Sequence, residues 1–478
     1  MSTSFPGVRL DSADDQRLLT HVHPAGWVNP TPAPRYHLVV IGAGTAGLVT
    51  AAGAAGLGAR VALIERSLMG GDCLNTGCVP SKAILAGARQ GGDFAAVMER
   101  MRRLRADISP ADSAERFRGL GVDLFFGAAQ FTAPDRITVA GAELRFRRAV
   151  IAAGASPSFP PIPGLAEAGA HTSETIFALG EQPRHLLILG GGPIGCELAQ
   201  AFAGLGSRVT LVEQEPRVLP REDPDAAAVI GRALARSGVT LNLGARVERV
   251  SREASAIRLH LRDAAGMVEG DALLVAAGRT PRLDGLGLDA AGVRVEGGRL
   301  IVDDRLRTTS SRIYAVGDVL SKEQFTHAAD FQARMVIANA LFFGRGKASR
   351  LVTPRVTYTS PEVAAVGVAE GGDVITVPLA ENDRSVLEGA TDGFLRVHLN
   401  RGSDRMLGVT IVAPHACEMI SQAVVAMTNG VGLGGMGKAM HPYPTIAESY
   451  RKAADQWRRG KLTPLARRVL GAWFRVFR

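Results

Sequence analysis

Two stretches of the chain share one pattern of hydrophobic and polar positions. Each begins with a continuous apolar run, at residues 37–41 (HLVVI) and 185–189 (HLLIL), followed by a glycine turn and an alanine-rich segment. Each ends in a second apolar run that closes on an acid, at residues 61–65 (VALIE) and 209–213 (VTLVE). Runs without alternation are typical of parallel strands buried on both faces, so the repeat predicts two strand, turn, helix and strand units in an α/β fold.

The rest of the chain predicts further elements. Residues 98–118 carry Arg and Glu at helical spacing, and short alternating strands are expected around Phe125 and Ile137. The proline-rich stretch 156–164 (SPSFPPIPG) marks a domain boundary. Beyond Arg350 the pattern predicts another domain, with strands at 355–358, 394–399 and 408–413 and a helix at about 418–428.

The chain ends and one long apolar stretch need separate interpretation. The first 35 residues contain NPTPAP at positions 29–34, and because each proline disfavours helix at its predecessor, they predict an extended arm before regular structure begins at Tyr36. The start of the chain lacks the apolar run of a secretory signal. Residues 38–59 are uncharged, yet six glycines within them argue against a membrane span. The basic, amphipathic tail 466–478 has the character of a membrane-surface helix, but packing on its own domain is favoured, so membrane association is not expected.

Composition sets limits on size, partners and compartment. A chain of 478 residues, with 46% hydrophobic and 21% charged residues, is expected to form about three globular domains. Its formal charge of +9 comes from basic residues scattered among acidic ones, which argues against nucleic acid as a partner and suits attraction of anionic small molecules. Four cysteines are too few for a disulfide framework, so we expect a reducing, cytoplasmic location in which any disulfide is catalytic.

The first glycine turn has the spacing of a dinucleotide-binding site. Gly42, Gly44 and Gly47 stand where a tight turn, a pyrophosphate and helix packing leave no room for a side chain. The helix that follows offers backbone amides and a partial positive charge to phosphate. Glu65 lies at the end of the second strand, where a carboxylate can hold a ribose hydroxyl pair.

The second turn repeats this arrangement, so two bound dinucleotides are expected. Its glycines are Gly190, Gly192 and Gly195, and Glu213 stands at the acid position. An acid there favours the free 2′-hydroxyl of NADH, because a 2′-phosphate would call for arginine. Two arginines follow four and eight residues after this acid, which leaves NADPH open.

A redox relay between the two nucleotides is predicted at Cys73 and Cys78. Gly77 permits the turn between them, and a helix beginning near Cys78 would stabilise a thiolate through its dipole. Lys82, one turn further, adds a cation. The alternatives are two buried cysteines that never bond and half of a zinc site. The other half of such a site is missing, because neither remaining cysteine has a second ligand at the right spacing, so no metal is predicted.

The segment 70–82 (GGDCLNTGCVPSK) resembles the redox motif of the class I pyridine nucleotide-disulfide oxidoreductases, the FAD-dependent family of dihydrolipoamide dehydrogenase, glutathione reductase and mercuric reductase. The resemblance runs from residue 36 to about 465. It includes 314–318 (YAVGD), similar to the family's second FAD motif, and 276–279 (AAGR), similar to the end of its NAD domain. It implies two Rossmann-like FAD and NAD(P) domains plus a C-terminal α+β dimerisation domain. The implied ranges are an N-terminal arm at 1–35, the FAD domain at 36–157 and 281–352, the NAD(P) domain at 158–280 and the dimerisation domain at 353–478.

The resemblance also implies roles for individual residues. Cys78 would be the thiolate against the flavin, and Cys73 the thiol that exchanges with substrate. Asp318 would hold the FAD ribityl chain, and Glu197 would pair with Lys82. Besides the turn glycines and their two acids, the cofactor-binding residues implied are Lys82, Gly154, Asp318, Gly278 and Arg279.

The substrate-side motif departs from the family. There a His held by a Glu reaches across a homodimer as general base, whereas residues 441–448 (HPYPTIAE) place Tyr443 at the base position, His441 two residues earlier and Glu448 at the acid position. Because tyrosine titrates near pH ~10, ordinary dihydrolipoamide chemistry is disfavoured. Mercuric reductases resemble the chain in carrying this tyrosine, although the chain ends without their C-terminal cysteine pair. The chain therefore resembles the mercuric-reductase-like branch.

Together these features predict a homodimeric flavoenzyme that passes electrons from NAD(P)H, with NADH favoured, through FAD to the Cys73–Cys78 disulfide and on to a small-molecule acceptor. The acceptor stays open among a small disulfide, a lipoyl group as in dihydrolipoamide dehydrogenase, Hg(II), and an oxidised halogen or sulfur species. Two rival hypotheses also stay open. One is a flavin NAD(P)H oxidase or quinone reductase in which the cysteines are bystanders, and the other is a nucleotide-binding scaffold without turnover.

Overall fold

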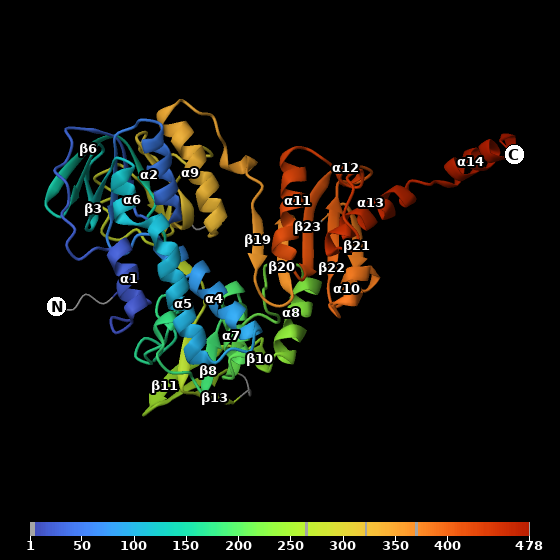
Figure 1. Cartoon of the computed structure of the whole chain (residues 1–478), viewed down its shortest axis with the longest axis horizontal. Coiled ribbons are helices and arrows are strands. Elements are labelled where there is room, and N and C mark those ends of the chain that lie inside the picture. Colours follow the sequence, from blue (N-terminus) through green and yellow to red (C-terminus); the bar gives the residue numbers. More distant parts are fainter. Residues whose placement is uncertain (1–4, 263–265, 321–322, 369–370, 478) are drawn as a thin grey trace. The chain divides into compact units, whose positions relative to one another are not determined.

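The computed structural model describes residues 5–262, 266–320, 323–368 and 371–477 (Figure 1). It divides into two compact units. Unit 1 comprises Met1–Gln214 and Ser237–Leu351, and unit 2 comprises Glu215–Arg236 and Val352–Arg478. Among the described residues, no helix is both long and apolar enough to cross a membrane.

The first sheet of unit 1 has the strand order β3-β2-β1-β6-β5-β4, with β18 also paired to β6. β1 is parallel to both β2 and β6, as the continuous apolar runs predicted. The reason is visible in β1, where Leu38 and Val40 pack into one hydrophobic cluster while Val39 and Ile41 pack into another on the opposite face. The strands are β1 (Tyr36–Ile41), β2 (Val61–Glu65), β3 (Val122–Phe126), β4 (Ala129–Ala133), β5 (Arg136–Val139), β6 (Ala142–Ile151) and β18 (Ile313–Ala315).

Helices pack in the hydrophobic cluster on one face of this sheet, and residues of β4, β5 and the segment 286–300 contribute to the cluster on the other face. α2 (Thr45–Gly56) follows the first glycine turn and packs with α9 (Thr326–Leu341) in the same hydrophobic cluster. α3 (Gly71–Asn75) and α4 (Cys78–Arg89) carry the two cysteines of the predicted relay. The short strand pairs are β7 (Ala155–Pro157) with β15 (Arg279–Pro281), and β16 (Val295–Glu296) with β17 (Arg299–Leu300).

The second parallel sheet of unit 1 has the order β10-β9-β8-β14. α7 (Pro193–Gly204) follows its glycine turn, so the repeat in the sequence corresponds to a repeat in structure. Its leucine-rich first strand is again buried, because three residues of it have no exposed surface. The strands are β8 (His185–Leu189), β9 (Arg208–Glu213), β10 (Val239–Leu243) and β14 (Ala272–Val275), next to an antiparallel sheet of β11 (Val247–Glu253), β12 (Ala256–Leu261) and β13 (Met267–Gly270).

The N-terminal segment contradicts the prediction of an extended arm. α1 (Ala13–Val22) begins at Ser12, whose side chain accepts a hydrogen bond from the backbone of Asp15, and it buries Leu18 and Val22. The prolines in this segment mostly follow the helix and restrict only the residues just before them, so they do not prevent helix earlier in the arm. The predicted helical stretch 98–118 is also divided, into α5 (Phe94–Ile108) and α6 (Ala114–Gly119).

Unit 2 contains an antiparallel sheet with the order β19-β20-β23-β22-β21. Residues of α11 and α13 pack in its hydrophobic cluster, so the predicted α+β domain is present. The strands are β19 (Pro354–Thr357), β20 (Glu362–Gly367), β21 (Asp373–Pro378), β22 (Phe394–Leu399) and β23 (Met406–Ala413). The helices are α8 (Pro224–Arg236), α10 (Asp383–Leu387), α11 (Ala416–Thr428), α12 (Leu433–Met436), α13 (Ser449–Gly460) and α14 (Pro464–Val476).

The C-terminal tail is helical but does not pack on its domain as expected. α14 contains no buried residue, and its large apolar side chains are exposed. The expectation of packing is therefore wrong for the described residues of the tail.

Candidate active site

The first glycine turn forms a cradle whose geometry explains each glycine separately. A Cβ at Gly42 would lie 2.3 Å from the carbonyl oxygen of Ala152, and one at Gly47 would lie 1.7 Å from that of Gly42. A Cβ at Gly44 would instead meet only the Cα of Gly71, at 3.6 Å. Two glycines are thus required by backbone packing, and the middle one leaves space at the start of α2. Phosphate oxygens fit such a space, because the first amides of a helix point into it.

The second turn has the same design. A Cβ at Gly190 would lie 2.6 Å from the carbonyl oxygen of Ala276, and one at Gly195 would lie 2.0 Å from that of Gly190. A Cβ at Gly192 would meet nothing within 4 Å. Both cradles therefore fit a pyrophosphate at a helix N-terminus.

The two acids close their cradles from the side. Glu65 accepts hydrogen bonds from the backbone amides of Ala43 and Ser67, each at 2.7 Å, and Glu213 accepts one from Gly191 at 2.5 Å. Burial raises the pKa of Glu65, and these amide bonds oppose the rise. A carboxylate has about four lone-pair sites, so Glu65, which accepts two amide bonds, retains capacity for a ribose hydroxyl.

Cys73 and Cys78 lie on consecutive short helices. α3 ends just before Gly77, where a Cβ would lie 2.7 Å from the carbonyl oxygen of Asp72, and α4 begins at Cys78 as the sequence predicted. Both cysteines are free thiols in the structure. The Sγ of Cys78 lies 3.3 Å from the Oγ1 of Thr326, the first residue of α9.

The surroundings of the two cysteines shift their pKa values in opposite directions, so one is a thiolate and the other a thiol. A hydrogen bond from Cys73, followed by the bond from Thr326 and the charge of Lys82, lowers the pKa of Cys78 to about 6. Donating that bond to Cys78, together with burial, raises the pKa of Cys73. At neutral pH the pair therefore carries one negative charge, on Cys78.

The redox segment contacts the first cradle and the helix that follows the second. Gly70 pairs with Gly44 of the first cradle in a parallel bridge. On the other side, the Nζ of Lys82 lies 2.7 Å from the Oε2 of Glu197, a buried acid on α7, the helix of the second cradle. This ion pair fixes a cation one turn from Cys78.

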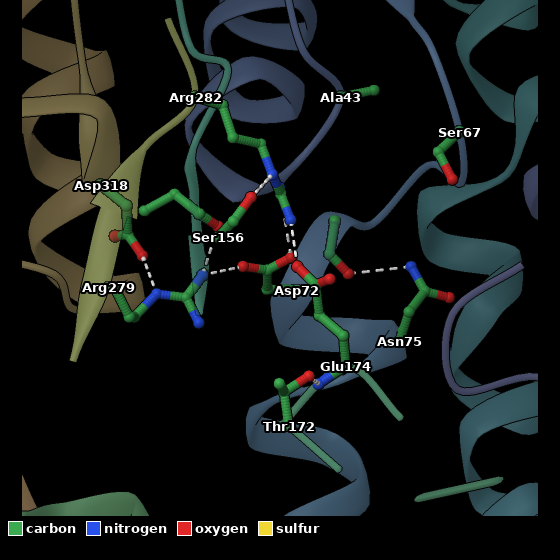
Figure 2. A network of polar contacts seen from close by, with 12 residues as sticks. Ala43, Ser67, Asp72, Asn75, Ser156, Thr172, Glu174, Arg279, Arg282 and Asp318 are labelled. Carbon is green, nitrogen blue, oxygen red and sulfur yellow. Dashed lines mark hydrogen bonds and ion pairs between the residues drawn. The ribbon is translucent and has the colours of Figure 1, made fainter. Parts of the chain in front are cut away.

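Two further predicted cofactor residues, Arg279 and Asp318, belong to a network of charged groups (Figure 2). Arg279 forms ion pairs with Asp72 and, at 3.7 Å, with Asp318, and it donates to the carbonyl oxygen of Ala155 at 2.7 Å. Burial, along with the charges of Asp72 and Cys78, raises the pKa of Asp318 to about 6, and Arg279 opposes the rise. Arg282 completes the network through Asp72, Glu174 and Ser156.

Two predicted glycines border this network. Gly154 has φ +71°, and a Cβ there would lie 3.5 Å from an Nη of Arg282. Gly278 has φ +114°, and a Cβ there would meet nothing within 4 Å. Both therefore adopt left-handed backbone, which glycine adopts most readily.

Sequence reasoning missed several residues of the site. Asp72 directly precedes Cys73, and Arg282 follows Arg279 by three residues. Their closeness in sequence to predicted site residues could have identified both. Thr326 and Glu174 carry no local signal, because tertiary packing alone brings them to the site.

The substrate-side residues lie in unit 2 and form different pairs from those of a His–Glu base. The hydroxyl of Tyr443 donates to Asp383 at 2.9 Å, which raises the pKa of the tyrosine. Glu448 forms an ion pair with Arg451. Within the described part of the chain, no hydrogen bond joins Glu448 to Tyr443 or His441. Tyr443 is thus a protonated donor at neutral pH, and His441 lacks the acid that would orient it.

Alkylation of Cys78 in the reduced protein should follow the thiolate fraction, with a half-maximal rate near the pKa of about 6. Because this pKa is lowered, the thiolate persists at pH 7 and is lost only as the pH falls through about 6. Thr326→Val removes one hydrogen bond to the sulfur and should move the half-maximal point upward. The measurement is the rate of iodoacetamide modification against pH, read at Cys78 by mass spectrometry.

Thr240→Val, at an exposed threonine of β10, is the matched control and should leave the profile unchanged. A half-maximal point near ~8.5, the ordinary value of a free thiol, would contradict the assigned environment.

Two family models match the chain. The model described as pyridine nucleotide-disulphide oxidoreductase matches residues 36–333. The model of the corresponding dimerisation domain matches residues 353–454. The first match contains both cradles and the cysteine pair, and the second contains the Tyr443 segment.

Relatives and solved structures agree with these matches. The chain is 33% identical over 446 residues to a mercuric reductase of Bacillus cereus, covering 87% of this chain and 71% of that protein. It is 33% identical over 451 residues to a dihydrolipoyl dehydrogenase of Thermus scotoductus, covering 88% and 97%. The structure of the HOCl-induced flavoprotein disulfide reductase RclA from Escherichia coli, in its Cu(II) complex, superposes with a TM-score of 0.82 at 32% identity and covers 89% of this chain and all of that one.

Proposed function

The chain belongs to the pyridine nucleotide-disulphide oxidoreductase family of FAD- and NAD(P)H-dependent flavoprotein enzymes, and from this membership we propose that it reduces a thiophilic acceptor through Cys73 and Cys78. The observation that carries the proposal is the asymmetric sulfur pair, with a thiolate at Cys78 and a thiol at Cys73, on a segment that contacts the first cradle and the helix of the second. In this proposal Cys78 is the sulfur nearer the flavin, and Cys73 exchanges with the acceptor.

The two cradles divide the cofactors between them. Residues 36–157 and 281–352 would bind FAD, with Glu65 and Asp318 as its polar partners, and residues 158–280 would bind NAD(P)H. Bound FAD would supply two-electron transfer between the nicotinamide and the disulfide. The chain itself would place two charged features beside the bound flavin. One is the cation of Lys82, held by Glu197, and the other is the Asp72–Arg279–Asp318 network.

Hg(II), the acceptor of a mercuric-reductase-like enzyme, is favoured over a disulfide because its reduction requires no proton donor. Reduction of Hg(II) by NAD(P)H yields Hg(0), NAD(P)⁺ and one proton, so the acceptor itself takes up no proton. Reduction of a disulfide to two thiols consumes protons and needs an acid or base near the leaving sulfur. Tyr443 already donates its hydroxyl proton to Asp383, and its raised pKa makes it a weak acid, so it is a poor proton donor to a leaving sulfur; Glu448 is occupied by Arg451. Soft sulfur ligands are what Hg(II) requires, and the reduced pair provides two.

Glu213 supports a preference for NADH. Its carboxylate is buried beside the second cradle and fixed by the amide of Gly191. A 2′-phosphate in that position would bring a second negative charge to this carboxylate, which is unfavourable at short range. NADH, with its free 2′-hydroxyl, would instead donate a hydrogen bond there.

The C-terminal domain supports a homodimer, because residues 353–454 match the family's dimerisation domain. The Tyr443 segment would then serve the cysteine pair of the partner subunit. The small number of cysteines makes a reducing, cytoplasmic compartment part of the proposal.

The test is an anaerobic panel of acceptors with the FAD-loaded protein. Hg(II) as a thiol complex, lipoamide, glutathione disulfide and a quinone are each assayed with NADH and with NADPH. The proposal predicts the highest kcat/KM with Hg(II), and at least about tenfold preference for NADH, the effect of some 1.4 kcal/mol. Faster turnover of lipoamide than of Hg(II) would identify a dihydrolipoyl dehydrogenase and overturn the acceptor assignment.

A further inference from the structure

α14 (Pro464–Val476) is a folded helix whose described residues are all at least partly exposed. Its start has its own signals, because Thr463 caps the backbone amide of Ala466 and Pro464 occupies the first turn. The preceding helix is anchored, since Tyr450 and Ala453 of α13 have no exposed surface. α14, labelled at the C-terminal end in Figure 1, has no buried residue. An isolated helix of 13 residues is marginal in water, so a surface that covers its apolar side would stabilise it.

The side chains of α14 divide into two faces. Leu465, Val469, Trp473, Val476 and Phe477 recur at helical spacing, so they share one broad apolar face with Leu470 and Phe474 beside it. Trp473 is 58% exposed and Phe477 is 66% exposed. The opposite strip carries the arginines of the helix and a glycine, in the order Arg467, Arg468, Gly471 and Arg475.

The positive charge of the tail favours an anionic lipid surface over a second copy of α14 as the partner of its apolar face. From residue 456 to the C-terminus the sequence has seven basic residues and no acidic one. Two copies of α14 packed through their apolar faces would cover those faces, but the arginines on the opposite strips would gain no charge partner, because α14 carries no carboxylate. An anionic lipid surface instead accepts apolar and aromatic side chains at the headgroup boundary and attracts each arginine.

We propose that α14 binds the surface of anionic lipid bilayers, lying in the interface with its Trp473 face toward the acyl chains and its arginines toward the headgroups. This inference does not depend on the proposed reductase activity. It reverses the expectation, drawn from sequence, that the tail packs on its own domain.

Vesicle flotation of the full-length, FAD-loaded protein tests the proposal. Phosphatidylcholine vesicles are compared with vesicles that also contain phosphatidylglycerol, at low and high salt. We expect flotation with the anionic vesicles only, a loss at high salt, and a blue shift of tryptophan fluorescence on binding. Deleting residues 464–478 should abolish flotation while leaving turnover with the soluble acceptor unchanged.

Point variants separate the two faces. Trp473→Ala with Phe477→Ala should remove flotation, whereas Phe342→Ala with Phe343→Ala, at aromatics of unit 1 that are 55% and 88% exposed, should not. Arg467→Gln should weaken binding to the anionic vesicles about fivefold, from the typical contribution of one arginine near such a surface.

Three outcomes would overturn the proposal. They are no flotation of the full chain with anionic vesicles, equal flotation of the truncated chain, and equal binding to vesicles without phosphatidylglycerol. A change of oligomeric state on truncation without any vesicle binding would assign α14 to contacts between copies of the chain.

Discussion

Cys78→Ser is expected to lower NAD(P)H-dependent turnover of the acceptor by on the order of 1,000-fold or more, since a group that acts covalently is removed. The sulfur is lost where the pKa of about 6 makes it a thiolate at neutral pH, and a serine hydroxyl in its place stays protonated. Cys73→Ser should have a comparable effect, because neither sulfur can form the disulfide alone. The measurement is steady-state turnover of the FAD-loaded variants with the best acceptor of the panel.

Cys417→Ser is the matched control. Cys417 is partly exposed and lies in α11 of unit 2, and it should be replaceable with less than about twofold change in turnover, as is usual for a surface substitution. If Cys73→Ser left turnover intact with every acceptor, the cysteines would be bystanders and the chain a flavin oxidase or quinone reductase.

Asp15→Ala is expected to have the largest effect on stability, about 3–5 kcal/mol in the free energy of unfolding. Asp15 and Arg105 have no exposed side-chain surface and form an ion pair at 2.6 Å. Removing the carboxylate leaves a buried guanidinium without its counter-charge. Arg105 also donates to the carbonyl oxygen of Asn75, between the two cysteines in sequence, so the loss should loosen the redox segment as well.

The comparison is urea unfolding of the wild-type chain, Asp15→Ala and Asp11→Ala. Asp11 pairs with Arg9 at the surface, and exposed pairs contribute ~0–1 kcal/mol, so the midpoint for Asp11→Ala should barely move. Equal midpoints for both variants would show that the buried pair adds no net stability.

The parts predicted well from sequence are those specified by residues close together in the chain. The glycines of each cradle, the acid that follows and the two flanking strands form one local unit, so the local pattern predicted the parallel strand pair at the centre of each sheet. Cys78 at a helix start is equally local, because Gly77 and the residues after it determine where α4 begins.

The failures concern structure that depends on distant residues. The buried Asp15 of α1 pairs with Arg105, which follows it by 90 residues, and no pattern within the arm reveals that partner. Asp72, Arg279 and Asp318 come from three separate segments and meet only through tertiary packing. Tyr443 was identified from its motif, but its partner Asp383 lies 60 residues earlier and was not foreseen.

The tail illustrates a different limit. The amphipathic pattern of residues 466–478 predicts a helix with one covered face, but the pattern does not say what covers it. Packing on the domain is the common outcome for such a helix, and α14 instead remains exposed.

The central claim, that Cys73 and Cys78 exchange electrons with bound flavin, is tested most directly by anaerobic reductive titration of the FAD-loaded protein. The account predicts that full reduction consumes twice as many electrons per FAD as flavin alone, with a long-wavelength thiolate-to-flavin absorbance band at the halfway point. Complete bleaching of the flavin with the electrons that flavin alone accepts, and no such band, would contradict it.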